Sequence, residues 1–361
     1  MKLEDLDYDL PPERIAQHPA ARREDARLLV VERATGVLHD QRIPDLDRWL
    51  KPGDALALNE TRVIPARLAV RRASGGRVEL LFVRPAAAAA ASPGADAIAG
   101  AARGERWRVL ARPAKRVRPG ETLASDDGAL ALEVVEAGEG AAAGERVVRV
   151  ARGDLAATLA RAGELPLPPY IHRAADAEDR ERYQTVFARV DGAIAAPTAG
   201  LHFTAAHLAA LEAAGVGVTR VLLHVGPGTF RPVTVSDPRA HRMDEEYFEV
   251  GADAAARLAA ARARGGRIVA VGTTVVRALE SACDRGAGAL APASGWTRAF
   301  IVPPYTFRAV DALLTNFHLP RTTLLLLVAA FMGEDLLRRA YAHAVATGYR
   351  FYSYGDAMLI V

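Results

Sequence analysis

Three loops of this sequence combine glycine and threonine directly after an apolar run, and two of them include a histidine. The first is AAPTAGLHFT at 195–204, which precedes a helix-like segment with Thr204 in the N-cap position. Turns from a strand into a helix present backbone N–H groups to whatever occupies the site, so they often bind polar ligands. The candidate ligand-contacting residues of this loop are Thr198, Gly200, His202 and Phe203.

Two more loops follow the same pattern. LHVGPGTFRPV at 222–233 supplies His224, Gly226, Gly228 and Thr229, and IVAVGTTVVRALES at 268–281 supplies Gly272, Thr273 and Thr274. Glycine lets a ligand approach the backbone closely, and a helix N-terminus attracts anionic or polar groups. A glycine-rich loop alone is usually only a tight turn; three of them on successive strands of one sheet favour one shared site.

Proton transfer in such a site needs a titratable group. His202 and His224 stand in or beside these loops and are candidate acids or bases, and Asp356 is a lone carboxylate beside a glycine near a C-terminal apolar run. A structural role for each of the three is an equal alternative. The other histidines show no spacing typical of zinc ligands, and the glycines fit neither a P-loop nor a dinucleotide fold. We therefore expect no metal and no nucleotide cofactor.

The elements that position these loops alternate between helix and strand after Gly163. Before it, from about Asp54 to Val150, short β-branched runs separated by Gly, Pro and Asp predict antiparallel strands of a small barrel. The fold class is therefore α/β: a discontinuous α/β domain of residues 1–55 and 151–361, with a mostly antiparallel, barrel-like β domain inserted at 56–150. An Ala-rich stretch at 86–103 is expected to be a surface loop.

Composition sets further limits. The chain has 361 residues, one cysteine and a formal net charge of +3, which by itself does not require a nucleic-acid partner. The charged N-terminus is unlike a signal peptide, and the apolar run at 324–332 is too short to cross a bilayer. We expect a cytoplasmic monomer without a membrane partner.

A basic cluster lies within the β-rich segment, in ARPAKRVRPG at 111–120. Together with a cation at the start of that segment, it gives the candidate contacts with nucleic-acid phosphates, Arg62, Arg112, Lys115 and Arg116. A solvated edge strand protected by charge is an alternative of equal weight.

Taken together, long stretches of the chain resemble the S-adenosylmethionine:tRNA ribosyltransferase-isomerase family of queuosine biosynthesis. The matching stretches include DYDLPPERIAQHP, LALNETRVIPARL, ARPAKRVRPG, LPLPPYI, DRERYQTVFA, AAPTAGLHFT, LHVGPGTFRPV, VAVGTTVVRALES, VDALLTNFHLPRTTLLLLVAAFMG and YRFYSYGDAMLI. The resemblance implies transfer of the ribosyl part of S-adenosylmethionine to the 7-aminomethyl-7-deazaguanine at the tRNA wobble position. The ribosyl group is isomerised to give epoxyqueuosine, adenine and methionine are released, and no cofactor beyond the co-substrate S-adenosylmethionine is implied.

The family pattern does not assign the proton-transfer roles. We choose His202 first for proton transfer and Phe203 for stacking on a base. The sequence departs from the usual family pattern at Asp244, where histidine is common, at Val275, where serine is usual, and at Pro304, where glycine is common. The first departure argues against an obligatory catalytic histidine at that position.

Two rival functions remain. An S-adenosylmethionine-dependent RNA methyltransferase would share both substrates, but the expected Gly-rich loop after the first strand of the α/β domain is not evident. A non-catalytic tRNA-binding module would need only the β-rich domain, and it leaves the three loops unexplained. The length of the resemblance favours the ribosyltransferase-isomerase.

Overall fold

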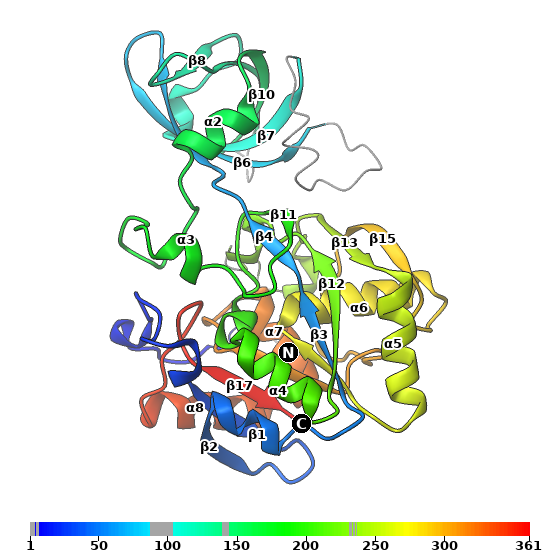
Figure 1. The fold of residues 1–361 in the computed structure, drawn as a ribbon. Helices are drawn as coiled ribbons and strands as arrows, with labels where there is room; N and C mark the ends of the chain where they lie inside the picture. Colours follow the sequence, from blue (N-terminus) through cyan, green and yellow to red (C-terminus); the bar gives the residue numbers. More distant parts are fainter. Residues whose placement is uncertain are drawn as a thin grey trace.

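The computed structural model describes residue 4 and residues 7–86, 104–138, 144–230, 233, 235 and 237–361. It contains a nine-stranded sheet covered by helices and a closed six-stranded barrel, joined by a small two-stranded sheet (Figure 1). This confirms the α/β class with an antiparallel β-barrel. Most of the Ala-rich stretch at 86–103 lies outside the described residues.

The large sheet has the strand order β15-β13-β12-β3-β14-β16-β17-β1-β2. Its four central strands, β12, β3, β14 and β16, run parallel. The strand bounds are β1 (Arg27–Val31), β2 (Leu38–Arg42), β3 (Ala55–Asn59), β12 (Gly217–Leu223), β13 (Glu246–Val250), β14 (Ile268–Val271), β15 (Ala293–Thr297), β16 (Ala312–Asn316) and β17 (Ala357–Ile360).

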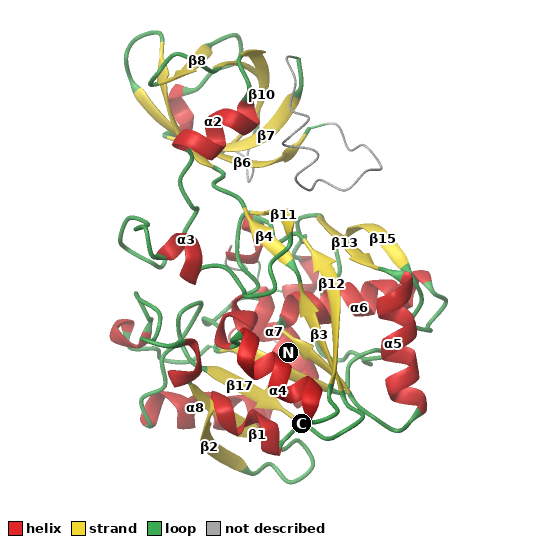
Figure 2. Cartoon of the chain, in the orientation of Figure 1, coloured by secondary structure: helices red, strands yellow, loops and turns green. Residues whose placement is uncertain are grey.

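Both faces of this sheet are covered, which explains why β3, β14 and β16 are apolar and buried along their full length. Alternate residues of each strand enter opposite cores: Leu56 packs in the core with α4, and Ala55 packs in the core with α5 to α8. The helices are α4 (Ala205–Ala213), α5 (Ala252–Ala263), α6 (Thr273–Arg285), α7 (Thr323–Met332) and α8 (Glu334–Ala346). Figure 2 shows this layered arrangement.

The barrel closes in the order β10-β7-β6-β5-β8-β9, with antiparallel pairing throughout. Large apolar side chains such as Phe82 and Trp107 alternate with outward-facing residues and fill its interior. Helix α2 (Leu155–Ala162) adds Leu155 and Leu159 to the same core. The barrel strands are β5 (Arg67–Arg72), β6 (Arg77–Pro85), β7 (Arg106–Arg112), β8 (Thr122–Ser125), β9 (Ala131–Ala137) and β10 (Glu145–Arg152).

Two short strands connect the barrel to the large sheet. β4 (Thr61–Val63) leads into the barrel and β11 (Val190–Ala193) comes after it, and the two pair in parallel. The sequence boundary between 55 and 56 cuts through β3, which belongs to the large sheet, and the boundary at 150–151 falls inside β10. Helix α3 (Asp179–Arg182) lies in the segment between α2 and β11.

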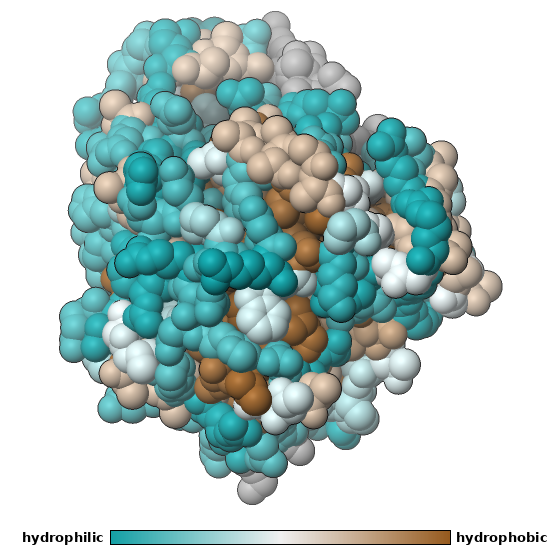
Figure 3. Space-filling view, turned by 60° about the horizontal axis from the view of Figure 1, so that its bottom comes forward, coloured by the Kyte–Doolittle hydropathy of each residue, from teal (hydrophilic) through white to brown (hydrophobic). Residues whose placement is uncertain are grey.

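The surface is largely polar. Figure 3 shows hydrophobic residues in small, separate patches among hydrophilic ones on the face drawn there. Among the described residues the exposed large hydrophobic side chains are Val37 and Val186. No helix in this part of the chain is long and apolar enough to cross a membrane.

Candidate active site

The carboxyl ends of the parallel central strands meet at one edge of the large sheet, where ligand sites of α/β proteins are expected. Two hollows lie at this edge and share Val225. The first, which we call the barrel-side cavity, has a volume of about 180 Å³ and lies between the barrel strands β6 and β7 and the sheet strands β12, β13 and β15. Its lining includes Arg84, Arg108, Glu145, Gly192, His224, Gly226, Asp244, Glu245, Tyr247, Trp296 and Arg298.

His224 forms part of the wall of this cavity and directly follows β12. Its Nδ1 lies 2.7 Å from the hydroxyl oxygen of Thr61 on β4. Its Nε2 is buried and has no hydrogen-bond partner among the described residues. One ring nitrogen is therefore fixed by the protein while the other is available for a ligand.

Glycine and aromatic residues hold the His224 ring in place. Gly192 lies at the register shift of β11, with a φ of 147°, and a Cβ at this position would come within 2.6 Å of His224 Cε1. Tyr247 stacks on the other side, with ring centroids 6.2 Å apart, and Trp296 meets Tyr247 edge to face at 5.9 Å. The cavity thus has an aromatic wall beside its histidine.

Burial lowers the pKa of His224 from 6.5 to about 4. The imidazole is therefore neutral at physiological pH and able to accept a proton. Nε1 of Trp296 and Nε of Arg108 are also buried without described hydrogen-bond partners, and both residues line the same cavity. Because buried polar atoms are nearly always hydrogen-bonded, three such atoms around one cavity indicate a polar ligand.

Charged groups of both signs surround the cavity. Arg84 lies 3.4 Å from Glu245 and over the ring of Trp296, and Arg298 lies 3.1 Å from Glu245. Burial and the neighbouring Arg108 lower the pKa of Arg84. Such a mixed lining suits a ligand that carries both a carboxylate and cationic groups.

The second hollow, which we call the threonine pocket, has a volume of about 50 Å³. Gly272 is the N-cap of α6 and has a φ of 98°. Because Gly272, Thr273 and Thr274 line the pocket, the first turn of α6 borders it. Thr198 donates to Asn316 Oδ1 at 2.8 Å, and Asn316 donates to the backbone oxygen of Tyr352 at 3.1 Å. The pocket brings together the predicted residues Thr198, Gly272, Thr273 and Thr274 with Tyr170, Thr315, Asn316, His318, Thr322, Tyr352 and Ser353.

His202 lies behind the threonine pocket and does not line it. Its Nε2 is 3.3 Å from Asn316 Nδ2, and its side chain is buried. Burial, followed by the charges of Arg350 and Arg23, lowers its pKa to about 3. His202 therefore reaches the pocket through Asn316.

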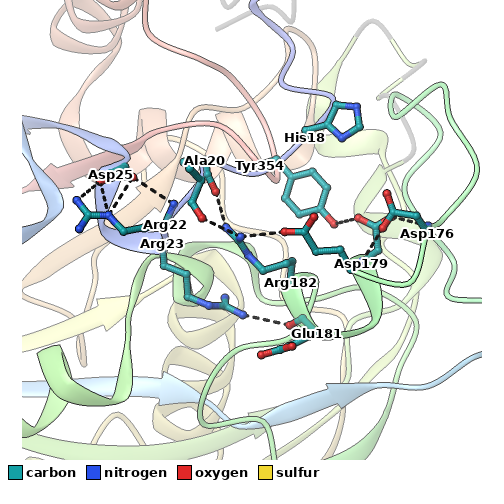
Figure 4. Close-up of polar contacts among 12 residues, drawn as sticks. His18, Ala20, Arg22, Arg23, Asp25, Asp176, Asp179, Glu181, Arg182 and Tyr354 are labelled. Carbon is teal, nitrogen blue, oxygen red and sulfur yellow. Dashed lines mark hydrogen bonds and ion pairs between the residues drawn. The ribbon is translucent and has the colours of Figure 1, made fainter.

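Arginine side chains join the N-terminal segment to the α3 segment (Figure 4). Arg23 donates to the backbone oxygens of Leu201 at 3.0 Å and Glu181 at 3.1 Å, and Arg182 donates to Ala21 O at 3.1 Å. Tyr354 donates to Asp179 at 2.6 Å. These bonds connect the α3 segment to the N-terminal segment. The guanidinium groups of Arg23 and Arg182 are therefore already hydrogen-bonded within the protein.

Phe203 and Gly200 pack in the protein interior. Phe203 is fully buried in the core with α4 and stacks on His207 with ring centroids 5.5 Å apart, so it is not placed to stack on a substrate base. A Cβ on Gly200 would meet Phe187 at 2.6 Å, which explains the glycine by packing.

Asp356 is also placed for structure. One carboxylate oxygen accepts from the backbone N–H of Arg27 at 2.9 Å and the other from that of Arg350 at 2.7 Å. It lines neither the barrel-side cavity nor the threonine pocket. One oxygen therefore holds the start of β17 against β1, and the other fastens it to the segment that follows α8.

The loop after β12 borders the barrel-side cavity at Gly226, whose N–H donates to Glu246 at 2.7 Å. Glu246 also forms a buried ion pair with Arg277. A Cβ on Gly228 would meet Asp244 at 2.5 Å, so this glycine is tied to one of the departures from the family pattern. Thr229 lies in η8 (Pro227–Phe230), and its side chain is outside the described part of the structure.

The predicted cationic residues are exposed. Arg112 ends β7, Lys115 and Arg116 lie in η5 (Ala114–Arg116), and Arg62 lies on β4, 3.7 Å from Asp191. Of the other departures, Val275 lies on the buried face of α6, and Pro304 precedes Tyr305, which donates to Glu280 at 3.2 Å. Neither contacts the two hollows.

Sequence reasoning missed Thr61, Gly192, Tyr247 and Asn316. Asn316 ends the apolar strand β16 and Thr61 follows the end of β3 by two residues, which is the signal that identified the three loops. Gly192 and Tyr247 carried no such signal, because their role depends on packing against His224. Within the described ranges, no group of three or more His, Cys, Asp or Glu residues is placed to hold a metal ion.

Comparisons with known proteins give a consistent result. Over residues 3–360 the chain matches the family described as queuosine biosynthesis protein. Proteins named S-adenosylmethionine:tRNA ribosyltransferase-isomerase are similar to it: one from Symbiobacterium thermophilum is 49% identical, with 100% of both chains covered, and one from Anaeromyxobacter dehalogenans is 52% identical, with 100% of this chain and 99% of the relative covered. The crystal structure of S-adenosylmethionine tRNA ribosyltransferase from Thermotoga maritima matches with a TM-score of 0.54 and 35% identity, covering 99% of this chain and 100% of that one.

Proposed function

The chain belongs to the queuosine biosynthesis family, and from this premise we propose that it is an S-adenosylmethionine:tRNA ribosyltransferase-isomerase. It transfers the ribosyl group of S-adenosylmethionine to 7-aminomethyl-7-deazaguanine at the wobble position of tRNA and isomerises it to epoxyqueuosine. Adenine and methionine leave. The observation that carries the proposal is the match along the whole chain to relatives of that name, at about half identity.

His224 is our proposed proton acceptor. The sulfonium of S-adenosylmethionine acidifies the neighbouring C–H bonds, so a neutral imidazole at that carbon can start the rearrangement. The pKa of about 4, the unpartnered Nε2 and the cavity position of His224 support this role over His202. The proton that His224 takes is then available to the adenine leaving group.

The two hollows offer complementary surroundings for the substrates. We place the polar part of S-adenosylmethionine near Thr198, Thr273 and Thr274, where the first turn of α6 adds a positive helix end. The barrel-side cavity, with Tyr247 and Trp296 on its wall, suits a flat base beside His224. Gly226 allows close approach of a ligand to the backbone between the two hollows.

The barrel and α2, residues 67–162, form our proposed inserted unit, and the remainder forms the α/β unit. We propose that the enzyme acts as a monomer, since one chain supplies both the parallel strand ends and the barrel strands around the barrel-side cavity. We assign the enzyme to the cytoplasm, where it meets tRNA.

A labelling experiment tests the function. Purified protein is incubated with tRNA carrying 7-aminomethyl-7-deazaguanine and S-adenosylmethionine labelled in the ribose or in the methyl group. We expect ribose label in the tRNA, methyl label in free methionine, and adenine in equal amount. A methyltransferase leaves the bond between ribose and adenine intact, so methyl label in the tRNA without adenine would refute the assignment.

A further inference from the structure

The outer face of the barrel strands β5, β6 and β7 carries arginines at alternate positions. Arg108 and Arg112 point outward from β7, because the alternate residues Trp107, Val109 and Ala111 are buried. Cross-strand register places Arg112 opposite Glu79 of β6. We call Arg67, Arg77, Arg108 and Arg112 the arginine face.

The arginine face extends from the barrel-side cavity to a third hollow, which we call the barrel hollow. Arg108 lines the barrel-side cavity, and Arg112, four residues further along β7, lines a hollow of about 280 Å³. At about 3.3 Å per residue, the two positions are about 13 Å apart. The barrel hollow is lined by Arg67, Ala69, Arg77, Glu79, Arg112 and Glu164.

Two of these arginines are not engaged elsewhere in the described structure. Arg77 and Arg112 are exposed and form no ion pair or hydrogen bond with a described side chain. Arg67 lies 3.7 Å from Glu79 and donates to the backbone oxygen of Leu167 at 3.2 Å. Beyond Arg112, the exposed cations of η5 extend the same charge.

The sign of the charge distinguishes this hollow from another on the α/β unit. Three arginines and two glutamates line the hollow on the arginine face. The other hollow, of about 520 Å³ beside β12 and α5, is lined by three arginines and four carboxylates: Arg189, Arg220, Arg257, Glu60, Glu212, Glu249 and Asp253. Of these two hollows, the one on the arginine face has more cationic than anionic side chains and can attract an anion.

We propose that the arginine face binds the sugar–phosphate backbone of the tRNA strand next to the base in the barrel-side cavity. This inference rests on the proposed function, which supplies the tRNA. Enzymes that modify a base act on a single strand or turn the base out of the stack, so the flanking phosphates must continue along the protein surface from the site. Arginines spaced along a strand provide the contacts that position such a backbone.

The test uses the full-length double variant Arg77→Gln/Arg112→Gln and an anticodon stem–loop RNA carrying the precursor base. For single-stranded contacts the slope of log K against log salt should fall by about 0.7 per lost phosphate, hence by about 1.4 for the pair. The KM for RNA should rise while kcat for adenine release at saturating RNA is unchanged. The matched control is Arg220→Gln/Arg257→Gln in the other hollow, which should leave the slope as in wild type.

A complementary variant, Glu79→Gln, removes an anion from the proposed path and should tighten RNA binding. That gain cannot come from partial unfolding, so it remains informative if the double variant proves unstable. An unchanged salt slope and KM in the double variant, or an equal change in the control pair, would overturn the arginine face while leaving the proposed function intact. Wild-type protein that releases no adenine with this RNA would instead refute the function.

Discussion

The hydroxyl oxygen of Thr61 lies 2.7 Å from Nδ1 of His224, although the two residues are 163 positions apart in the chain. Thr61 is fully buried on the strand that leads into the barrel. The contact fixes the ring orientation of the proposed base and determines which nitrogen faces the cavity.

Thr61→Val should lower kcat by about 10- to 100-fold, because the hydrogen bond that orients His224 is lost while the shape of the side chain is kept. Thr61→Ser retains a hydroxyl and should recover most of the activity. Adenine release at saturating substrates gives kcat, and calorimetry with S-adenosylmethionine checks that binding is retained. Equal activity of the Val and Ser variants would contradict a positioning role.

His224→Ala should lower kcat by roughly two to four orders of magnitude, as expected for loss of a general base. His202→Ala should cost less activity and more stability, because His202 is buried behind Asn316. The comparison requires single-turnover adenine release and urea unfolding for both variants. If His202→Ala loses more activity per folded molecule than His224→Ala does, His202 is the proton acceptor and His224 has the structural role.

Gly192→Ala should displace the His224 ring, since the new Cβ would come within 2.6 Å of Cε1 and the φ of 147° disfavours a side chain. A misplacement of about 1 Å at a reacting group can cost on the order of 10²-fold in rate. Gly217→Ala, at the start of β12 and away from both hollows, is the control, because its Cβ would make only ordinary contacts of 3.6 Å or more. Crystal structures of both variants would report the ring position directly; an unmoved ring in Gly192→Ala would refute the expectation.

Stability should fall as the pH is lowered below about 6.5. Burial lowers the pKa of His224 to about 4 and that of His318 to about 3, and His202 is lowered to about 3 by burial and nearby arginines. Between 6.5 and these values the unfolded chain binds protons that the folded protein does not, so each histidine contributes a loss of up to about 1.4 kcal/mol per pH unit. Urea unfolding at several pH values measures the slope.

The variant His318→Gln removes one of these titrating groups and should make that slope shallower. A slope equal to that of wild type would show that His318 does not titrate in this way. Above pH 6.5 these histidines are neutral in both states, so they should cause no change in stability there.

The sequence predicted the elements well where the signal was local. Thr204 caps α4 by accepting from the N–H of His207 at 3.1 Å, as its position before the helix suggested, and the apolar run at 324–332 lies in the buried helix α7. The loops after β12 and β14 do lie at one edge of the large sheet, because parallel strands bring their carboxyl ends together. The loop at 195–204 follows β11 of the two-stranded sheet, and the three loops line two hollows rather than one.

Side-chain direction within those loops was harder to predict. A short turn such as 195–204 has no periodicity that separates inward from cavity-facing residues, so Phe203 was assigned to a ligand when it packs in the core. Asp356 was ambiguous for a related reason: its partners are backbone N–H groups of residues brought near by folding. Thr61 and Gly192 are near His224 only because β4 and β11 pair.

That pairing limits how the barrel can be exchanged between relatives. The two strands that carry the chain into and out of the barrel also supply the hydroxyl and the glycine that hold His224. A chimaera that exchanges residues 56–150, the borders predicted from the sequence, would take residue 61 from the relative and keep Gly192 from this chain. Grafts joined after Val63 and before β11 would keep both Thr61 and Gly192, and so the contacts that hold His224, from the same protein.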